Sequence, residues 1–330
     1  MSKPLQRFLT ELIDYAGLFP PAQLPMDTAV ANYARYRTSE DAWMMSRFIC
    51  PASRLRELQP YRDNLFQSEA PFRFSVIGGG GRDRGQFLTR LKKDIENIRD
   101  FQLFHEGQIG VEIFETRLPE ALLRKPDAAA ITDFIKEITA TFSKSELPPI
   151  TLFLEAGFSG KWREAIAIVI KAIAAHNRLL GDSETLKSSP PAGFKLRCGG
   201  VEPQMYPTPE QVAASIECVQ RFDVPLKATA GLHHPVRHFN KRENVKMHGF
   251  LNVFGAGILA DAHALDEKEI LEIVADENPK NFLFTRRAFA WKGLRASSED
   301  IQRAREKRVI SFGSCSFDEP REDLAAMKLL

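Results

Sequence analysis

The chain has 330 residues, of which 44% are hydrophobic and 27% are charged, and its net charge is +2. This composition is typical of a folded protein with a large apolar core. A net charge so close to zero argues against a nucleic-acid surface, so we expect no nucleic-acid partner. The four cysteines lie far apart without a C-x-x-C pair, which excludes a disulfide framework and a zinc knuckle. No apolar run is long enough to span a bilayer and no signal peptide is visible. We therefore expect a cytoplasmic protein without a membrane partner.

The first 43 residues are predicted to be helical and to precede every strand. Apolar residues recur at helical spacing from Leu5 to Ile13, and Asp27 can cap a second helix that ends near Arg37. The proline-rich stretch 18–27 separates the two helices. We expect residues 1–43 to form an N-terminal helical extension, followed by one domain of residues 44–330.

From residue 44 onward, strand-like and helix-like segments alternate. The predicted strands cover residues 46–50, 72–77, 109–114, 150–156, 193–198, 225–230 and 250–254, with an eighth inside 282–291. Helix starts are signalled by capping patterns at Thr208 and Asp266. The polar stretch 181–191 is predicted to be a surface loop, and residues 311–320 show no regular pattern. Eight strand–helix units predict an α/β fold, a (β/α)8 TIM-type barrel, with an open doubly wound sheet as the alternative.

Three cations occupy two neighbouring predicted strands. Lys195 and Arg197 lie two residues apart, so they share one face of their strand, and Lys227 lies on the next strand. A strand covered by helices is normally apolar on both faces, and a cation there is costly unless it faces a polar cavity or a ligand. We therefore expect these side chains to converge on a cavity that binds a small anionic carbonyl, carboxylate or phosphate molecule.

Other polar residues complete the candidate site, because barrel enzymes place reactive groups at the carboxyl ends of their strands. His233 directly follows the strand 225–230 and is predicted to be a general acid or base. The predicted catalytic residues are Lys227, His233 and Glu155. The predicted substrate-binding residues are Lys195, Arg197, His234, Asn252, Glu115, Gly199 and Gly200. The two glycines leave room for a ligand and equally suit a tight turn.

Lys227 is predicted to be a Schiff-base nucleophile. Neighbouring cations would favour its neutral amine, the form that attacks a carbonyl carbon. The segment K-A-T-A-G at 227–231 resembles the K-x-S-T-G motif on the sixth strand of deoxyribose-phosphate aldolase-type barrels. The resemblance implies an aldolase-like lyase whose Schiff base forms on Lys227. Those enzymes carry a second lysine one strand later; here that segment reads FLNVFGA, so Lys195 and Arg197 would supply the charge.

Two alternative functions stay open. His233 or His234 could bind a divalent metal with Glu115 or Glu155, as in a metal-assisted hydrolase, lyase or isomerase, whereas the Schiff-base route needs no cofactor. A barrel that binds a ligand without catalysis is the third candidate.

Two further stretches carry predictions. Cys315, in the segment GSCS, could be a nucleophile, although the sequence pairs no base with it. The charged loop 233–247 is predicted to be a mobile lid over the site. The composition is also compatible with a homo-oligomer.

Overall fold

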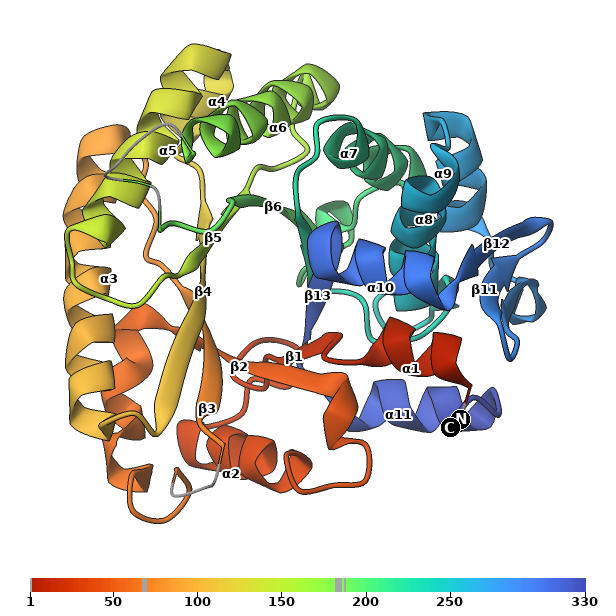
Figure 1. The fold of residues 1–330 in the computed structure, drawn as a ribbon, viewed down its shortest axis with the longest axis horizontal. Coiled ribbons are helices and arrows are strands. Elements are labelled where there is room, and N and C mark those ends of the chain that lie inside the picture. Colours follow the sequence, from red (N-terminus) through yellow and green to blue (C-terminus); the bar gives the residue numbers. More distant parts are fainter. Residues whose placement is uncertain (1, 67–69, 182–185, 187) are drawn as a thin grey trace. The chain divides into compact units, whose positions relative to one another are not determined.

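The computed structural model describes residues 2–66, 70–181, 186 and 188–330 (Figure 1). Within these residues eight parallel strands form a closed barrel. Around the barrel the order is β1 (Ile13–Tyr15), β13 (Val309–Ser314), β7 (Leu226–Thr229), β6 (Gly193–Arg197), β5 (Thr151–Glu155), β4 (Ile109–Arg117), β3 (Phe72–Ile77) and β2 (Met45–Pro51). Helices alternate with these strands along the chain, so the predicted (β/α)8 barrel is confirmed.

The chain divides into two compact units. Unit 1 comprises Met1–Gln23, Tyr36–Ser46 and Leu196–Leu330, and unit 2 comprises Leu24–Arg35 and Arg47–Lys195. Each unit has its own buried apolar core. In unit 2, for example, the rings of Phe74 and Phe101 pack edge to face with centroids 5.1 Å apart, and in unit 1 those of Phe250 and Phe312 stack at 5.4 Å.

In unit 2 the helical segments lie where the sequence pattern predicts them, except for the short helix at residues 120–124, which was not predicted. The helical segments are α2 (Met26–Tyr36), η2 (Ala52–Tyr61), α3 (Arg84–His105), α4 (Glu120–Arg124), α5 (Ala128–Ser143) and α6 (Trp162–Leu179). The predicted loop 181–191 includes residues 182–185 and 187, which lie outside the described residues.

Unit 1 contains the remaining helices and two small antiparallel sheets. Its helical segments are α1 (Lys3–Leu9), η1 (Ala42–Met44), η3 (Pro203–Met205), α7 (Pro209–Arg221), α8 (Phe250–His263), α9 (Glu267–Ala275), η4 (Pro279–Asn281), α10 (Ser298–Lys307) and α11 (Asp318–Ala326). Its small sheets are β8 (His238–Asn240) with β9 (Val245–Met247), and β10 (Phe282–Phe284) with β11 (Ala288–Trp291) and β12 (Leu294–Ser297). The capping boxes predicted at Thr208 and Asp266 are both present, at the starts of α7 and α9.

Two of the predicted barrel strands are not part of the barrel. Residues 250–254 form the first turns of α8, in which every residue from Phe250 to Ala260 is buried. A helix that is apolar on all sides shows no 3.6-residue period, so its first residues resemble a buried strand. The stretch 282–291 does contain strands, β10 and β11, but they belong to the small antiparallel sheet and not to the barrel.

Two barrel strands were missed. β1 lies inside the stretch 1–43 that we predicted to be helical, so this N-terminal segment contributes to the barrel wall. β13 lies where residues 311–320 showed no regular pattern. The two strands pair in parallel, with Asp14 opposite Gly313. β1 has only three residues and β13 contains Ser311, Gly313 and Ser314, so neither shows a recognisable apolar pattern in the sequence.

Across the ranges that the structure describes, no helix has the length and hydropathy needed to cross a membrane.

Candidate active site

Lys227 is at the centre of the first polar cluster, in unit 1. Its side chain is fully buried, and its Nζ donates a hydrogen bond to the carboxylate of Asp14 on β1. Nζ also lies 3.4 Å from Ser311 Oγ on β13, and that hydroxyl donates to Asp14 Oδ2 at 2.6 Å. The neighbouring strands β7, β13 and β1 therefore bring an amine, a hydroxyl and a carboxylate into mutual contact in the barrel.

This environment differs from the one predicted for Lys227. The sequence placed cations next to it, whereas the structure gives it a buried carboxylate as an ion-pair partner. A buried ammonium and a buried carboxylate each lose hydration, and only close contact and additional hydrogen bonds offset that cost. Asp14 was absent from the predicted site because its strand was not recognised. The signal available in the sequence was an acidic residue between the apolar residues Ile13 and Tyr15.

A second polar cluster, in unit 2, brings together three of the predicted site residues. Lys195 Nζ on β6 lies 2.9 Å from Glu115 Oε2 on β4 and 3.3 Å from Glu155 Oε2 on β5. Ser75 Oγ on β3 donates to Glu115 Oε1 at 2.5 Å. All four residues are buried. Two carboxylates face one ammonium here, which suits proton transfer better than it suits the binding of an anion.

Arg197, the last residue of β6, donates from Nη1 to the carbonyl oxygen of Gly199 at 3.5 Å. It belongs to unit 1, as does Lys227, whereas Lys195 belongs to unit 2. The convergence of these three cations on one cavity therefore stays a prediction.

The glycines after β6 permit a close approach of two loops. A Cβ atom on Gly199 would lie 2.8 Å from the Cα of Gly231, and a Cβ on Gly231 would lie 2.6 Å from the carbonyl oxygen of Cys198. Similarly, a Cβ on Gly200 would lie 2.5 Å from Met205 Sδ. The absence of a side chain at these glycines is therefore required by protein packing, and contact with a ligand stays a prediction.

Asn252 lies on α8 and not at a strand end. Its Oδ1 accepts from the backbone N–H of Arg237 at 2.8 Å, and its Nδ2 donates to the carbonyl oxygens of Ile273 and Asp276, each at 2.8 Å. The amide is fully buried, so it links the start of the β8–β9 hairpin to the end of α9. The strand-end argument that selected Asn252 no longer applies.

The loop 233–247 contains the β8–β9 hairpin and begins with two histidines that face α11. His233 Nδ1 lies 3.7 Å from Cys315 Sγ and 3.3 Å from Glu319 Oε2. His234 Nδ1 lies 2.5 Å from Asp323 Oδ2. Glu319 and Asp323 are four residues apart on α11 and therefore share one face of that helix. The mobility predicted for this loop stays a prediction.

The pKa of His233 reflects these contacts. Burial alone would lower it, but hydrogen bonds to Cys315 and Glu319, together with their charges, raise the pKa to about 9. The imidazole is therefore protonated at neutral pH. The sequence paired no base with Cys315, because that pairing depends on β13, which places Cys315 at the carboxyl end of a strand next to β7.

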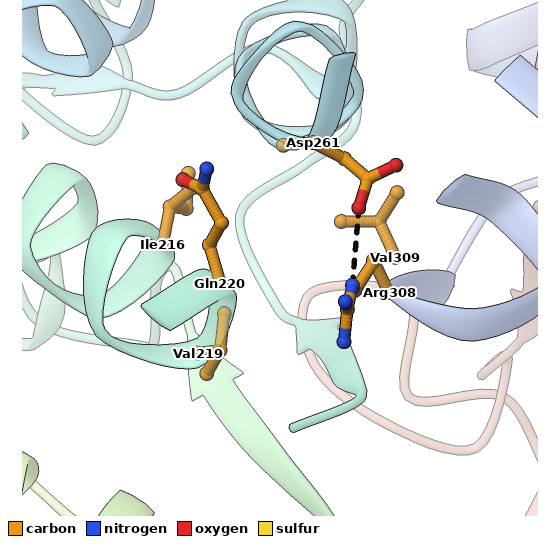
Figure 2. A pocket seen from close by; sticks show the side chains of 7 residues that line it. Ile216, Val219, Gln220, Asp261, Arg308 and Val309 are labelled. Carbon is orange, nitrogen blue, oxygen red and sulfur yellow. Dashed lines mark hydrogen bonds and ion pairs between the residues drawn. The ribbon is translucent and has the colours of Figure 1, made fainter. Parts of the chain in front are cut away.

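A small cavity lies at the opposite end of β13 (Figure 2). It is lined by Ile216, Val219, Gln220, Gly257, Asp261, Arg308 and Val309. Figure 2 shows Arg308 and Asp261 on one side, where Arg308 Nε donates to Asp261 Oδ1 at 3.1 Å, and the α7 side chains on the other. With a volume of about 10 Å³ the cavity has room for one water molecule, so it is no substrate site.

In the portion of the chain that the structure describes, no three His, Cys, Asp or Glu side chains are placed to hold a metal ion together. No protein-family model matches the chain, and no curated protein is similar to it in sequence. The functional argument therefore rests on the geometry of the polar clusters.

Proposed function

We propose that the protein is a barrel lyase of the aldolase type, in which Lys227 forms an imine with a small carbonyl substrate. The observation that supports this most is the buried contact of Lys227 with Asp14 and Ser311. An ion pair in a barrel interior adds little stability compared with apolar residues of similar volume. A polar cluster at this position is therefore better explained by chemistry than by folding.

The ion pair provides a route to the neutral amine. Moving one proton from Lys227 Nζ to the carboxylate of Asp14 converts two buried charges into two neutral groups. Because the two groups are in direct hydrogen-bond contact, the proton passes between them without an intervening water. The amine is then nucleophilic, and Asp14 becomes a carboxylic acid beside it.

The imine forms in two steps. The amine nitrogen attacks the carbonyl carbon, and the carbonyl oxygen takes up a nitrogen-bound proton to give a carbinolamine. Asp14 then protonates the carbinolamine hydroxyl, which leaves as water, while the nitrogen lone pair forms the protonated imine. Asp14 ends as a carboxylate beside the positive imine, and Ser311 Oγ, 2.6 Å from that carboxylate, stabilises its charged form by donating a hydrogen bond.

Carbon–carbon bond cleavage requires a further proton carrier. The predicted candidates for this role are His233 and Glu155, the latter in contact with Lys195. Because Lys227 and Asp14 are fully buried, the substrate must be small. Its anionic group is predicted to bind the guanidinium of Arg197.

Borohydride reduction tests this proposal. The native protein is incubated with a panel of small aldehydes and keto acids, reduced, and mapped by peptide mass spectrometry; the expected adduct is on Lys227. Lys227→Met and Lys227→Arg should abolish the adduct and the turnover, whereas Lys92→Met, at an exposed lysine of α3, should change neither. A substrate that is turned over without an adduct on Lys227 would refute the imine route. A ligand that raises the melting temperature without turnover or adduct would favour a non-catalytic binding barrel.

A further inference from the structure

A second group of reactive side chains lies further along the strands that carry Lys227 and Ser311. Cys315 directly follows β13, and His233 follows β7 after the short turn 230–232. β7 and β13 are paired in parallel, so both residues lie at the same, carboxyl end. Cys315 is four residues beyond Ser311, which corresponds to about 13 Å along an extended chain. The two groups are therefore separate centres at different depths of the barrel.

The turn after β7 holds His233 in place. Ala230 and Gly231 both have left-handed backbone conformations, with φ of 59° and 68°. Alanine is strained in this region, and such strain persists where surrounding structure fixes the chain. The close approach of Gly231 to the backbone of Cys198 and Gly199 provides that constraint. The turn after β7 therefore fixes the position of the imidazole relative to Cys315.

Two side chains share one ring nitrogen of His233, so a single N–H lies between a sulfur atom and a carboxylate. The imidazole Nδ1 of His233 faces both Cys315 Sγ, at 3.7 Å, and Glu319 Oε2, at 3.3 Å. Glu319 is half exposed and carries an ionised carboxylate, whose pKa is lowered mainly by its hydrogen bond to His233. An imidazolium held by a carboxylate balances the negative charge of an adjacent thiolate.

Two other cysteines, Cys50 and Cys198, are deeply buried. Burial raises the pKa of Cys50, and it raises that of Cys198 to about 12, so both thiols stay protonated at neutral pH. Cys218 is buried within α7. Cys315 and His233 are 7% and 8% exposed, which leaves access for small reagents but not for a macromolecule. Cys50 and Cys198 can therefore serve as reference cysteines when the reactivity of Cys315 is measured.

We propose that Cys315 is a nucleophile that adds reversibly to the carbonyl carbon of a small aldehyde, with His233 as its proton carrier. The reacting pair starts with the thiol proton already on His233, as an imidazolium, and the sulfur electron pair forms the S–C bond. The carbonyl π electrons move to oxygen, which receives the proton back from the imidazolium, and the product is a thiohemiacetal. Thiol and aldehyde account for all atoms of the product, and no oxidant or reductant takes part. The proposal does not depend on imine formation at Lys227.

Competitive labelling with N-ethylmaleimide tests the nucleophile. The native protein is treated at neutral pH with a limiting amount of reagent, and labelling of the four cysteines is followed over time by peptide mass mapping. We expect Cys315 to react at least about tenfold faster than Cys50 and Cys198, because an imidazolium lies next to its sulfur whereas burial keeps those two thiols protonated. Equal rates at Cys315 and the reference cysteines would overturn the proposal without the use of any variant.

Matched variants test the role of His233. His233→Asn should slow labelling of Cys315 about tenfold, and Glu319→Gln should slow it less, because the imidazole remains. His263→Asn removes a histidine that bonds the backbone of Arg295 and should leave the rate unchanged. Melting curves establish that each variant is folded. Unchanged labelling in folded His233→Asn would refute the assigned proton carrier.

Protection by glycolaldehyde tests the substrate class. Increasing glycolaldehyde should slow maleimide labelling of Cys315 in a saturable way, both in the native protein and in folded Lys227→Met. Rapid labelling of Cys315 without protection by glycolaldehyde would overturn the aldehyde assignment. Protection that disappears in Lys227→Met would show that the aldehyde reacts at Lys227 instead, which refutes this proposal and supports the imine route.

Discussion

The ammonium of Lys227 and the carboxylate of Asp14 are in contact although 213 residues separate them in the chain, and both side chains are fully buried. Removing one partner leaves an uncompensated charge, which typically costs about 3–5 kcal/mol of unfolding free energy. Lys227→Met and Asp14→Leu should each show such a loss in urea titrations. The double variant should lose clearly less than the sum, because no buried charge remains. Additive losses would show that the two groups do not interact in solution.

The Lys195 cluster leads to a prediction for unit 2. Lys195→Met leaves the carboxylates of Glu115 and Glu155 without the ammonium that lies between them. We expect a loss on the order of 3 kcal/mol in the unfolding free energy. Lys92→Met, at an exposed site, should change it by less than about 0.5 kcal/mol. Equal unfolding midpoints for the two variants would contradict the buried ion pairs.

Three buried histidines predict that stability falls on acidification. Burial lowers the pKa of His105, His176 and His248 to about 4 in the folded protein, below the ordinary value of 6.5. Between these values the unfolded chain binds more protons, so the unfolding free energy decreases as pH falls from 6.5 to 4. Asp94 has the opposite effect, because burial raises its pKa to about 6. Three groups against one leave a net loss, on the order of 3 kcal/mol for each uncompensated histidine.

Urea titrations at intervals between pH 7 and pH 4 measure this dependence. His176→Gln is the informative variant, because its amide can keep the contact that His176 Nε2 makes with Thr139 Oγ1 at 3.2 Å. The variant should lose part of the slope. A stability that stays flat or rises on acidification would contradict the prediction.

His233 predicts a loss of stability on the alkaline side. Its pKa of about 9 in the folded protein lies above the ordinary value of 6.5. The stabilisation from its charged contacts with Cys315 and Glu319 is therefore complete below pH 6.5 and disappears as pH rises through 9. Thermal melting between pH 6 and pH 9.5 should show this decline, with a size on the order of 3 kcal/mol. In His233→Asn the decline should be reduced, and an identical slope would contradict the prediction.

Replacing Asn252 is expected to weaken the structure without a direct effect on the polar clusters. Asn252→Ala removes three hydrogen bonds to backbone groups and leaves buried partners unpaired, at a cost of about 1–3 kcal/mol for each unpaired group. Hydrogen exchange should increase at the start of the β8–β9 hairpin and at the end of α9. Gln302→Ala, on the exposed face of α10, serves as the control. Exchange that is unchanged in the Asn252 variant would be incompatible with these contacts.

The sequence predicts the fold class and much of unit 2. Strands such as Phe72–Ile77 are mostly apolar, and the helices next to them show apolar residues at helical spacing. It also selects Lys195, Glu115 and Glu155, since charged residues in apolar strands stand out. It does not identify the partners of Lys227. Asp14 and Ser311 lie on strands that are too short or too polar to show a period, so their contact is visible only once the barrel closes. The pairing of Cys315 with His233 depends on the same missed strand.

The pairing of β1 with β13 also affects how the chain can fold during synthesis. Unit 1 contains both the first and the last residues of the chain, whereas unit 2 is almost entirely the continuous stretch Arg47–Lys195. At translation rates of about 5–20 residues per second, roughly 15–60 s pass between the synthesis of β1 and that of β13. Throughout that interval Asp14 lacks Ser311, and for most of it Lys227 has not been synthesised either. Unit 2 can form its core first, while residues 1–23 remain exposed to chaperones and proteases until the ribosome has released the last strand.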